Sequence, residues 1–169
     1  IVNNEIHKNM KSNFFTTDDF IPKIKINEKV ALVKYHPGYN PDSLKNIIEL
    51  GYKAMIFEGT GLGHIGENMY PVVKMANEKG IFMGMTSQCI DGRVRMTVYE
   101  SGRDLLNLGI TPLENMIPEI ALVKAMWVTG NTEKYDEIKE NMLNQIASEF
   151  TTWLENNMEK FSIKDAGVK

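Results

Sequence analysis

A compact apolar run, Lys29-Val-Ala-Leu-Val-Lys-Tyr35, has the composition of a buried β-strand. Two similar runs follow it, Ala54-Met-Ile-Phe57 and Ile81-Phe-Met-Gly-Met-Thr86. Each is too short for a typical helix and is followed by glycine-containing or polar residues. The three runs therefore predict three buried strands.

Helical patterns separate these runs. The turn formers of segment 36–42 end the first run, and Asn40 with Pro41 predicts the start of a helix that stops near Gly51. A second apolar repeat at helical spacing, from Met69 onward, ends at Gly80. Strands that alternate with helices are typical of a parallel sheet covered on both faces. The sequence thus predicts an α/β fold, a three-layer sandwich with a small parallel sheet flanked by helices.

The last third of the chain is predicted to be helical. One short helix spans 101–108, and a second begins at Pro118. A long third helix is predicted to begin after Asn131 or Thr132, with apolar residues three and four apart at Tyr135, Ile138, Met142, Ile146, Phe150, Trp153 and Leu154. Such a stripe must be covered, either by the sheet or by another chain. Packing within the domain is the simpler interpretation.

Composition narrows the class of protein. The chain has 169 residues and a mass of 19.2 kDa, with 43% hydrophobic and 24% charged residues, as in an ordinary single domain. A net charge of −3 disfavours nucleic-acid binding through a broadly basic face. The single cysteine, Cys89, cannot form an internal disulfide, which predicts the cytoplasm. No apolar run approaches the ~20 residues that span a bilayer, so no membrane partner is predicted.

Three units are predicted along the chain. Residues 1–27 are polar and irregular and are interpreted as a connector; residues 28–161 form the α/β domain; and residues 162–169 form a tail. The chain begins with Ile1 rather than Met, which indicates a piece of a longer protein.

Ligands of open parallel sheets bind beyond the carboxyl ends of the strands, which selects the loops 36–40, 58–64 and 87–93. The glycine-rich loop lacks both a Walker motif and the dinucleotide spacing, so a tight turn explains it equally well. His64 either bonds a ligand or caps the local backbone. Ser87 or Cys89 with His36 or His64 would make a nucleophile–base pair, but no known signature supports it.

Other polar groups have simpler explanations. Three scattered histidines and one cysteine show no ligand spacing, so no metal site is predicted. The hydroxyl and carboxylate run at 16–19 is explained by turn or helix capping. Glu114, Glu119 and Lys124 bracket the helix start at Pro118, where acidic residues suit the helix dipole. The residues alone thus predict a binding edge without a complete catalytic set.

Five blocks in order carry a resemblance that covers about residues 28–147. They are Glu58-Gly-Thr-Gly-Leu-Gly-His64, Thr86-Ser-Gln-Cys-Ile-Asp-Gly-Arg-Val94, Tyr99-Glu-Ser-Gly-Arg-Asp-Leu-Leu106, Gly109-Ile-Thr-Pro112 and Met116-Ile-Pro-Glu-Ile-Ala-Leu-Val-Lys-Ala-Met-Trp127. Together they resemble the carboxyl-terminal domain of the asparaginase-like family, and within it the D-subunit branch of archaeal glutamyl-tRNA(Gln) amidotransferases. A fainter likeness of Ile6–Phe15 and Pro22 to the family's interdomain linker implies that 1–27 connects to an absent amino-terminal domain.

The resemblance implies amide hydrolysis by a threonine, with ammonia leaving the side chain of Gln or Asn. In the D-subunit branch the ammonia passes to a partner, the amidotransferase E subunit, which uses ATP to amidate Glu-tRNA(Gln). The family's threonine motifs belong to the amino-terminal domain and are absent here; Thr16-Thr17-Asp18 lacks their glycine context. The resemblance therefore implies no catalytic residue and no cofactor in this chain, which alone is expected to be inactive.

What remains is a supporting role. The family's carboxyl-terminal domain builds a homodimer and lends residues to the neighbouring subunit's pocket. His64 takes the position of a substrate-reaching asparagine, and Thr60 and Gly61 shape its loop, so these three residues are the predicted substrate-binding set. Cys89 and Arg93 match positions of structural character. Two alternatives stay open: a stand-alone non-catalytic binding or dimerisation module, and a fragment of a plain L-asparaginase.

Overall fold

The computed structural model describes residues 22–151 and contains a four-stranded, fully parallel sheet. Its strands lie in chain order: β1 (Val30–Lys34), β2 (Ala54–Gly59), β3 (Phe82–Ser87) and the short β4 (Thr111–Pro112). The three apolar runs predicted to be strands are thus confirmed, and β4 adds a short edge strand that the sequence did not reveal.

Alternation along the strands divides the interior into two cores. Val33, Phe57 and Met85 are in register across β1, β2 and β3 and face one side of the sheet. Leu32, Ile56 and Gly84 lie one residue earlier on the same strands, are in register with one another and face the other side. Both faces of the central strands are buried, as a parallel sheet between helical layers requires.

The first helical layer covers one face of the sheet and consists of α1 (Asp42–Glu49), α2 (Tyr70–Glu78) and α3 (Glu100–Asn107), with a 3₁₀ turn at Glu67–Met69 before α2. Each helix follows a strand and returns the chain to the next one. Glycines in the left-handed region end all three, at Gly51, Gly80 and Gly109. These helices confirm the predicted ones, and Asn40 Oδ1 accepts the Asp42 backbone N–H at the start of α1.

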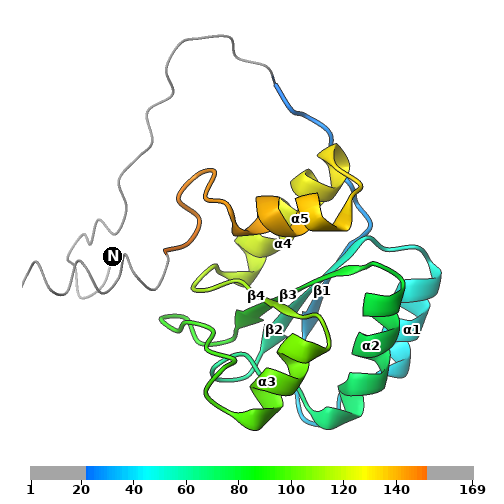
Figure 1. Cartoon of the computed structure of the whole chain (residues 1–169), viewed down its shortest axis with the longest axis vertical. Coiled ribbons are helices and arrows are strands. Elements are labelled where there is room, and N and C mark those ends of the chain that lie inside the picture. The colour runs from blue at the N-terminus through cyan, green and yellow to red at the C-terminus, as the bar shows by residue number, and fades with distance from the viewer. Residues whose placement is uncertain (1–21, 152–169) are drawn as a thin grey trace, which may run out of the picture.

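The second layer lies on the opposite face and contains α4 (Pro118–Asn131) and α5 (Tyr135–Leu143). Figure 1 shows the sheet between this layer and α1–α3, so the predicted three-layer sandwich is confirmed. In the second core, Ala121, Ala125 and Val128 of α4 pack with Ile138 and Met142 of α5. No helix in the described part of the chain is long and apolar enough to cross a bilayer.

The prediction of one long helix running to Leu154 is wrong. α5 ends at Leu143, where the backbone of Asn144 becomes extended, and Ser148 farther along has a positive φ of 57°. The cause is a buried ion pair: Glu149 turns inward to Lys124, and its carboxylate also accepts the backbone N–H groups of Ile146 and Ala147. Phe150 still reaches the second core, so domain packing covers that part of the stripe. Trp153 and Leu154 lie outside the described residues.

The segment 22–27, before β1, lies along α4. The Asn27 amide donates to the Met126 carbonyl at 2.9 Å, and Trp127 Nε1 donates to the Lys23 carbonyl at 2.8 Å. Asn131 donates to the Lys25 carbonyl at 2.9 Å. The assignments of 1–27 as a connector and 162–169 as a tail remain predictions, because residues 1–21 and 152–169 lie outside the described part.

Candidate functional site

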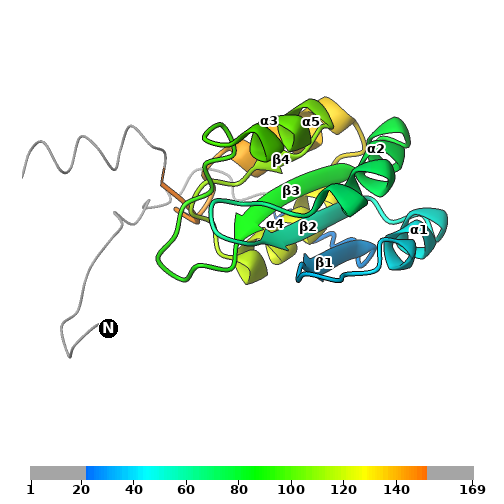
Figure 2. The same ribbon diagram turned by 90° about the horizontal axis from the view of Figure 1, so that it is seen from below.

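The carboxyl ends of β1, β2 and β3 lie at one edge of the sheet, where the three loops singled out in the sequence meet. Figure 2 shows the strand arrowheads ending at this edge, with the loops beyond them. Edges of this kind bind ligands in open α/β sheets because loops from different strands converge there. The structure therefore brings together the segments that the sequence placed apart.

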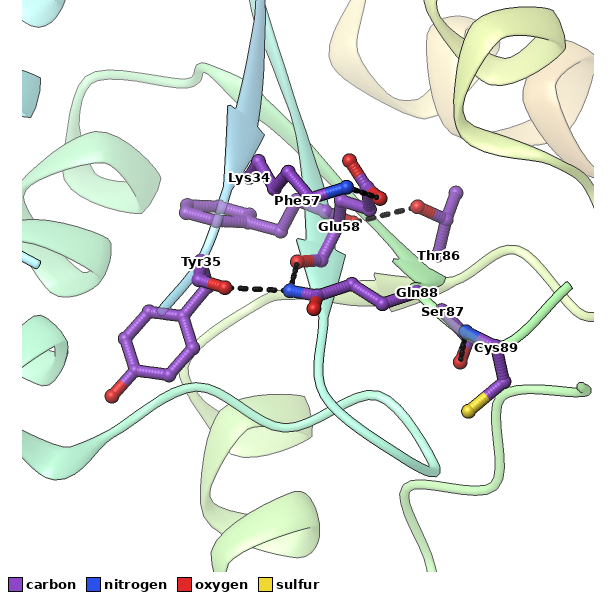
Figure 3. Close-up of polar contacts among 8 residues, drawn as sticks. All are labelled: Lys34, Tyr35, Phe57, Glu58, Thr86, Ser87, Gln88 and Cys89. Atoms are coloured by element: carbon purple, nitrogen blue, oxygen red, sulfur yellow. Dashed lines mark hydrogen bonds and ion pairs between the residues drawn. The ribbon is translucent and has the colours of Figure 1, made fainter. Parts of the chain in front are cut away.

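Gln88 ties these strand ends together. Its side-chain amide donates to the Tyr35 carbonyl at 2.5 Å and to the Glu58 carbonyl at 2.9 Å, and its backbone N–H donates to the Gly59 carbonyl at 2.9 Å. Figure 3 shows the amide pointing from the end of β3 across β2 toward β1. One side chain thus satisfies backbone acceptors on two neighbouring strands, which fixes the loops relative to one another.

The glycine-rich loop is a tight turn closed by its own backbone. Thr60 and His64 form an antiparallel bridge: the Thr60 N–H donates to the His64 carbonyl at 2.9 Å, and the His64 N–H donates to the Thr60 carbonyl at 3.0 Å. Gly61 and Gly63 adopt positive φ values of 52° and 94°, which glycine accommodates without strain. The Gly61 carbonyl accepts the Ser87 hydroxyl at 2.6 Å. The turn therefore holds the three predicted substrate-binding residues, Thr60, Gly61 and His64, together.

The His64 ring is held at an aromatic contact while one nitrogen lacks a partner. It packs edge-on against Tyr99, with 5.5 Å between ring centroids, and Tyr99 itself is 59% exposed. His64 Nε2 is inaccessible to solvent and has no hydrogen-bond partner among the described residues. An unpartnered buried ring nitrogen of this kind costs about 1–3 kcal/mol of stability.

The nucleophile–base pair weighed from the sequence is not assembled. The Ser87 hydroxyl donates to Gly61 and accepts the Cys89 N–H at 3.0 Å, so it is engaged with backbone groups. The His36 ring contacts Tyr39 and bonds the Pro37 carbonyl, and the His64 ring contacts Tyr99. Within residues 22–151, no group of three or more His, Cys, Asp or Glu side chains could hold a metal ion.

A groove of about 410 Å³ runs beside this edge, between the β3 loop and the start of α4. Its charged lining includes the ion pair of Lys34 Nζ with Glu58 Oε1, 2.8 Å apart, and Glu119 of α4. Neutral polar groups of Gln88 and Asn115 also line it. A larger cavity of about 530 Å³ lies at the opposite edge, beside residues such as Lys53 and Gly80 that precede β2 and β3. It is remote from the predicted substrate-binding residues.

Arg93 fixes the loop after β3, which agrees with the structural role that its sequence position suggested. Its guanidinium pairs with Glu114 Oε2 at 2.6 Å and donates to the Thr151 carbonyl at 2.8 Å. Asn115 also bonds Thr151, through both its amide nitrogen and its carbonyl oxygen. The segment after α5 is thus fastened to the edge that carries the candidate site. Glu114 has a positive φ of 58°, and the Val94 amide donates to its carbonyl.

A parallel four-stranded sheet, two helical layers and a glycine turn at the carboxyl edge define an α/β domain of the kind that contributes loops to a ligand site. The profile of the glutaminase/asparaginase C-terminal domain family matches residues 29–142. The chain belongs to that family, as the ordered sequence blocks predicted.

Curated relatives of the chain include D subunits of glutamyl-tRNA(Gln) amidotransferase. The D subunit of glutamyl-tRNA(Gln) amidotransferase from Sulfolobus acidocaldarius is 49% identical over 69% of this chain, and the match covers 26% of that protein. Its counterpart from Pyrococcus abyssi is 47% identical over 69% of this chain and 26% of its own length. The chain thus spans about a quarter of the length of these relatives, and the resemblance to the D-subunit branch is confirmed.

Solved structures agree on the fold. L-asparaginase I from Vibrio cholerae superposes with a TM-score of 0.76 at 25% identity, over 88% of this chain and 45% of that chain. The L-asparaginase from Thermococcus kodakarensis superposes with a TM-score of 0.68 at 32% identity, over 76% of this chain and 39% of that chain. The asparaginase-like character of the domain is therefore seen in sequence and in structure.

Two residues of this edge escaped the sequence analysis. Gln88 was only part of a loop, and its bridging role has no sequence signal because its partners are backbone carbonyls of residues 35 and 58. Tyr99 stood in a motif without a role, and only the fold places it against His64. The substrate-binding role of His64, Thr60 and Gly61 stays a prediction.

Proposed function

We propose that this chain is the carboxyl-terminal domain of an asparaginase-like amidotransferase D subunit, part of a complex that amidates Glu-tRNA(Gln). The single observation that carries this is the 49% identity to such a D subunit over 69% of the chain, which far exceeds the 25–32% identity to the two asparaginase structures. In this proposal the complete protein hydrolyses the side-chain amide of Gln or Asn, and the ammonia passes to the E subunit, which consumes ATP. This domain takes no cofactor of its own.

The domain's part in that reaction is to support it. The nucleophilic threonine belongs to the region that precedes the domain, and this chain supports a homodimer and offers its glycine turn to the neighbouring subunit's pocket. The position of His64 supports this role, because the glycine turn holds its ring at the carboxyl edge of the sheet, beside the exposed ring of Tyr99. Thr60 and Gly61 fix the turn that presents the ring. We place the protein in the cytoplasm; one solved structure that it resembles, at 26% identity and a TM-score of 0.57, is a probable cytoplasmic L-asparaginase from Campylobacter jejuni.

A plain L-asparaginase is the second candidate, and the structural matches to L-asparaginases favour it. The two candidates differ in the partner. An amidotransferase D subunit must hand ammonia to the E subunit and serve a tRNA-dependent reaction, whereas an asparaginase works without either.

The test is a fusion in which residues 28–169 replace the matching domain of the Sulfolobus acidocaldarius D subunit, purified with and without that organism's E subunit. We expect glutamine-dependent amidation of Glu-tRNA(Gln) within about tenfold of the unmodified complex. His64→Ala should lower ammonia release by about 10- to 100-fold, the value of a hydrogen bond to a charged group. His36→Ala, at the neighbouring strand end, is the matched control and should retain activity.

The proposal fails if the fusion folds and releases ammonia but does not support amidation with the E subunit. Ammonia release from asparagine without any effect of the E subunit would identify the asparaginase candidate. A folded fusion that is inactive with both amides would identify a domain that kept the fold and lost its supporting role.

A further inference from the structure

The segment 144–151 crosses from the second core to the carboxyl edge of the sheet. At its start, Lys124 Nζ donates to the Asn144 carbonyl at 2.6 Å, and the same ammonium pairs with Glu149. Phe150 is 3% exposed and packs in the second core. Figure 2 shows the segment, in orange, beside the end of the sheet where the strand arrowheads lie. The segment therefore reaches this edge from a fixed attachment in the core.

Thr151 is bonded at this edge through all of its polar groups. Arg93 donates to the Thr151 carbonyl at 2.8 Å and to its hydroxyl at 3.0 Å. Asn115 donates to the same hydroxyl at 3.1 Å and accepts the Thr151 N–H at 2.7 Å. These polar bonds lie outside the second core, to which Phe150 already attaches the segment. What they add is a fixed position for two loops, the one after β3 and the one before α4.

The loop after β3 connects Thr151 to the glycine turn. The Arg95 N–H, two residues after Arg93, donates to the Leu62 carbonyl at 2.9 Å. Val94 packs against the turn so closely that a Cβ on Gly63 would lie 2.7 Å from Val94 Cγ1. Because closely packed groups transmit displacements to one another, a shift of the loop at Arg93 moves the turn that ends at His64.

Glu114 strengthens this connection. Its carboxylate accepts the Arg93 guanidinium at 2.6 Å, and its carbonyl accepts the Val94 N–H at 2.9 Å. Its positive φ of 58° is uncommon for a residue of this type and persists where the surrounding bonds impose it. Residues held in this way cluster at functional sites.

We propose that Thr151 is a positioning residue of the candidate site. Through Arg93 and Asn115 it fixes the loops at the carboxyl edge, and with them the place of the glycine turn that presents His64. Thr151 itself contacts no substrate. The inference rests on the proposed function, in which this turn binds the substrate. It adds a residue beyond the family match at 29–142 and gives the segment after α5 a part in the site.

The experiment is backbone hydrogen exchange, followed by NMR, in the 169-residue chain and in its Thr151→Val variant, which keeps the shape of the side chain and removes the hydroxyl. We expect exchange of the Arg95, Gly63 and His64 amides to become at least threefold faster, because the turn loses part of its support. The Phe82 amide, which donates to the Lys53 carbonyl at the opposite edge, is the reference and should keep its rate.

Further variants separate this connection from a general loss of stability. Thr151→Ser retains the hydroxyl and should restore the rates of the natural chain. Thr132→Val is the matched control: it removes a hydroxyl that bonds Glu137, beside the cavity at the opposite edge, and should leave the rates of the turn unchanged. If Thr151→Val does not fold, Asn115→Ala gives the same measurement, because it removes both bonds of Asn115 to Thr151.

Activity is measured in the fusion with the Sulfolobus acidocaldarius D subunit, with and without Thr151→Val. We expect the KM for the amide substrate to rise at least threefold while kcat stays within twofold, because the turn is proposed to bind the substrate rather than to react with it.

Unchanged exchange at Gly63 and His64 in the folded variant would overturn the positioning role, as would an equal acceleration at Phe82. In either case an active fusion leaves the proposed function intact. An unchanged KM in an active fusion that carries Thr151→Val would also overturn the positioning role. Faster exchange confined to the turn, together with a fusion that is inactive even without Thr151→Val, supports the positioning role while the proposed function fails.

Discussion

The two helical layers cover opposite faces of the same sheet but differ in the side chains that they expose to solvent. In the first layer, α1 buries Leu44 and Ile48 and presents polar residues such as Lys45 and Glu49 to solvent. In the second, α4 buries Ala121 and Ala125 yet leaves Ile120 and Val123 exposed. A helix with one apolar side buries that side against the sheet and presents polar groups to water. A helix that is apolar on two sides leaves one apolar side exposed unless other protein covers it. The contrast shows that the outer side of α1 is polar, whereas the outer side of α4 carries exposed apolar side chains.

A second difference lies in the cores. The first core is closed by apolar side chains, while the second also contains the Lys124–Glu149 ion pair, whose side chains are 5% and 7% exposed. Burial lowers the pKa of Lys124, although its bond to Glu149 opposes the shift. Burial alone would raise the pKa of Glu149, but the hydrogen bonds from Lys124 and from the Ala147 amide lower it. The second layer is therefore held together by charge as well as by apolar contact.

The largest expected effect comes from breaking this pair. Glu149→Ala should destabilise the domain by about 3–5 kcal/mol, because Lys124 would remain buried without a counter-charge. Lys124→Met combined with Glu149→Leu should recover most of the loss, since apolar groups suit the second core. Urea unfolding measures both. The exposed pair Lys134–Glu137 is the control, and Glu137→Ala, which also removes the acceptor of the Thr132 hydroxyl, should change the unfolding free energy by less than about 1 kcal/mol. A small effect of Glu149→Ala would show that the layer does not depend on the pair.

The pH dependence of stability tests the same ion pair of the second core. Because the folded-state pKa of Glu149 is lowered, its stabilising contribution is complete at neutral pH and is lost as pH falls through that lowered pKa. The difference in unfolding free energy between the natural chain and Glu149→Gln should therefore shrink steadily on acidification. Urea titrations across the acidic range measure it, and a constant difference would contradict the account.

The carboxyl edge of the sheet is a third region, and it is stabilised by hydrogen bonds between its loops rather than by packing of the helical layers. Gln88→Leu should cost about 1–3 kcal/mol, because the Tyr35 and Glu58 carbonyls lose their common donor. Gln88→Glu should also lose the bonds, since a carboxylate cannot donate. Thermal unfolding measures the change, and Cys89→Ser, in the same loop but exposed, serves as the control. Equal midpoints for Gln88→Leu and the natural chain would remove the bridging role.

Gly130→Ala tests the attachment of the segment 22–27 to α4. An added Cβ would collide with the Lys25 backbone, while alanine favours the helix itself. We expect a change in stability within about 1 kcal/mol and a marked rise in hydrogen exchange at the Asn27 amide, which now bonds Met126. Asn131→Ala, which removes one bond to Lys25, should give a smaller rise. Unaltered exchange at Asn27 in Gly130→Ala would show that the segment is held elsewhere.

The smallest expected effect on stability is at His64. His64→Phe keeps the ring contact with Tyr99 and removes the unpartnered Nε2, so the unfolding free energy should stay the same or rise by about 1 kcal/mol. The same change in the complete protein should abolish the contribution of His64 to activity. Calorimetry of the chain checks the first part, and a clear loss of stability would indicate that His64 has a structural role.

Local patterns predicted most of the fold because β1, β2 and β3 are apolar on both faces and their helices end at glycines with positive φ. They failed after Leu143, where the apolar spacing continues but the inward turn of Glu149 toward Lys124 redirects the backbone. Spacing within one helix cannot report a partner 25 residues away. The same limit applies to the site: the glycine turn was visible in the sequence, whereas Gln88 and Tyr99 acquire their contacts only through the tertiary fold.

The most direct measurement is ammonia release from L-glutamine and L-asparagine by the purified 169-residue chain, with and without the preceding region supplied as a fusion. We expect no release above background from the chain alone and release from the fusion that depends on His64. Release from the chain alone that Ser87→Ala or Cys89→Ala abolishes would place the nucleophile in this domain and contradict its role as a supporting half.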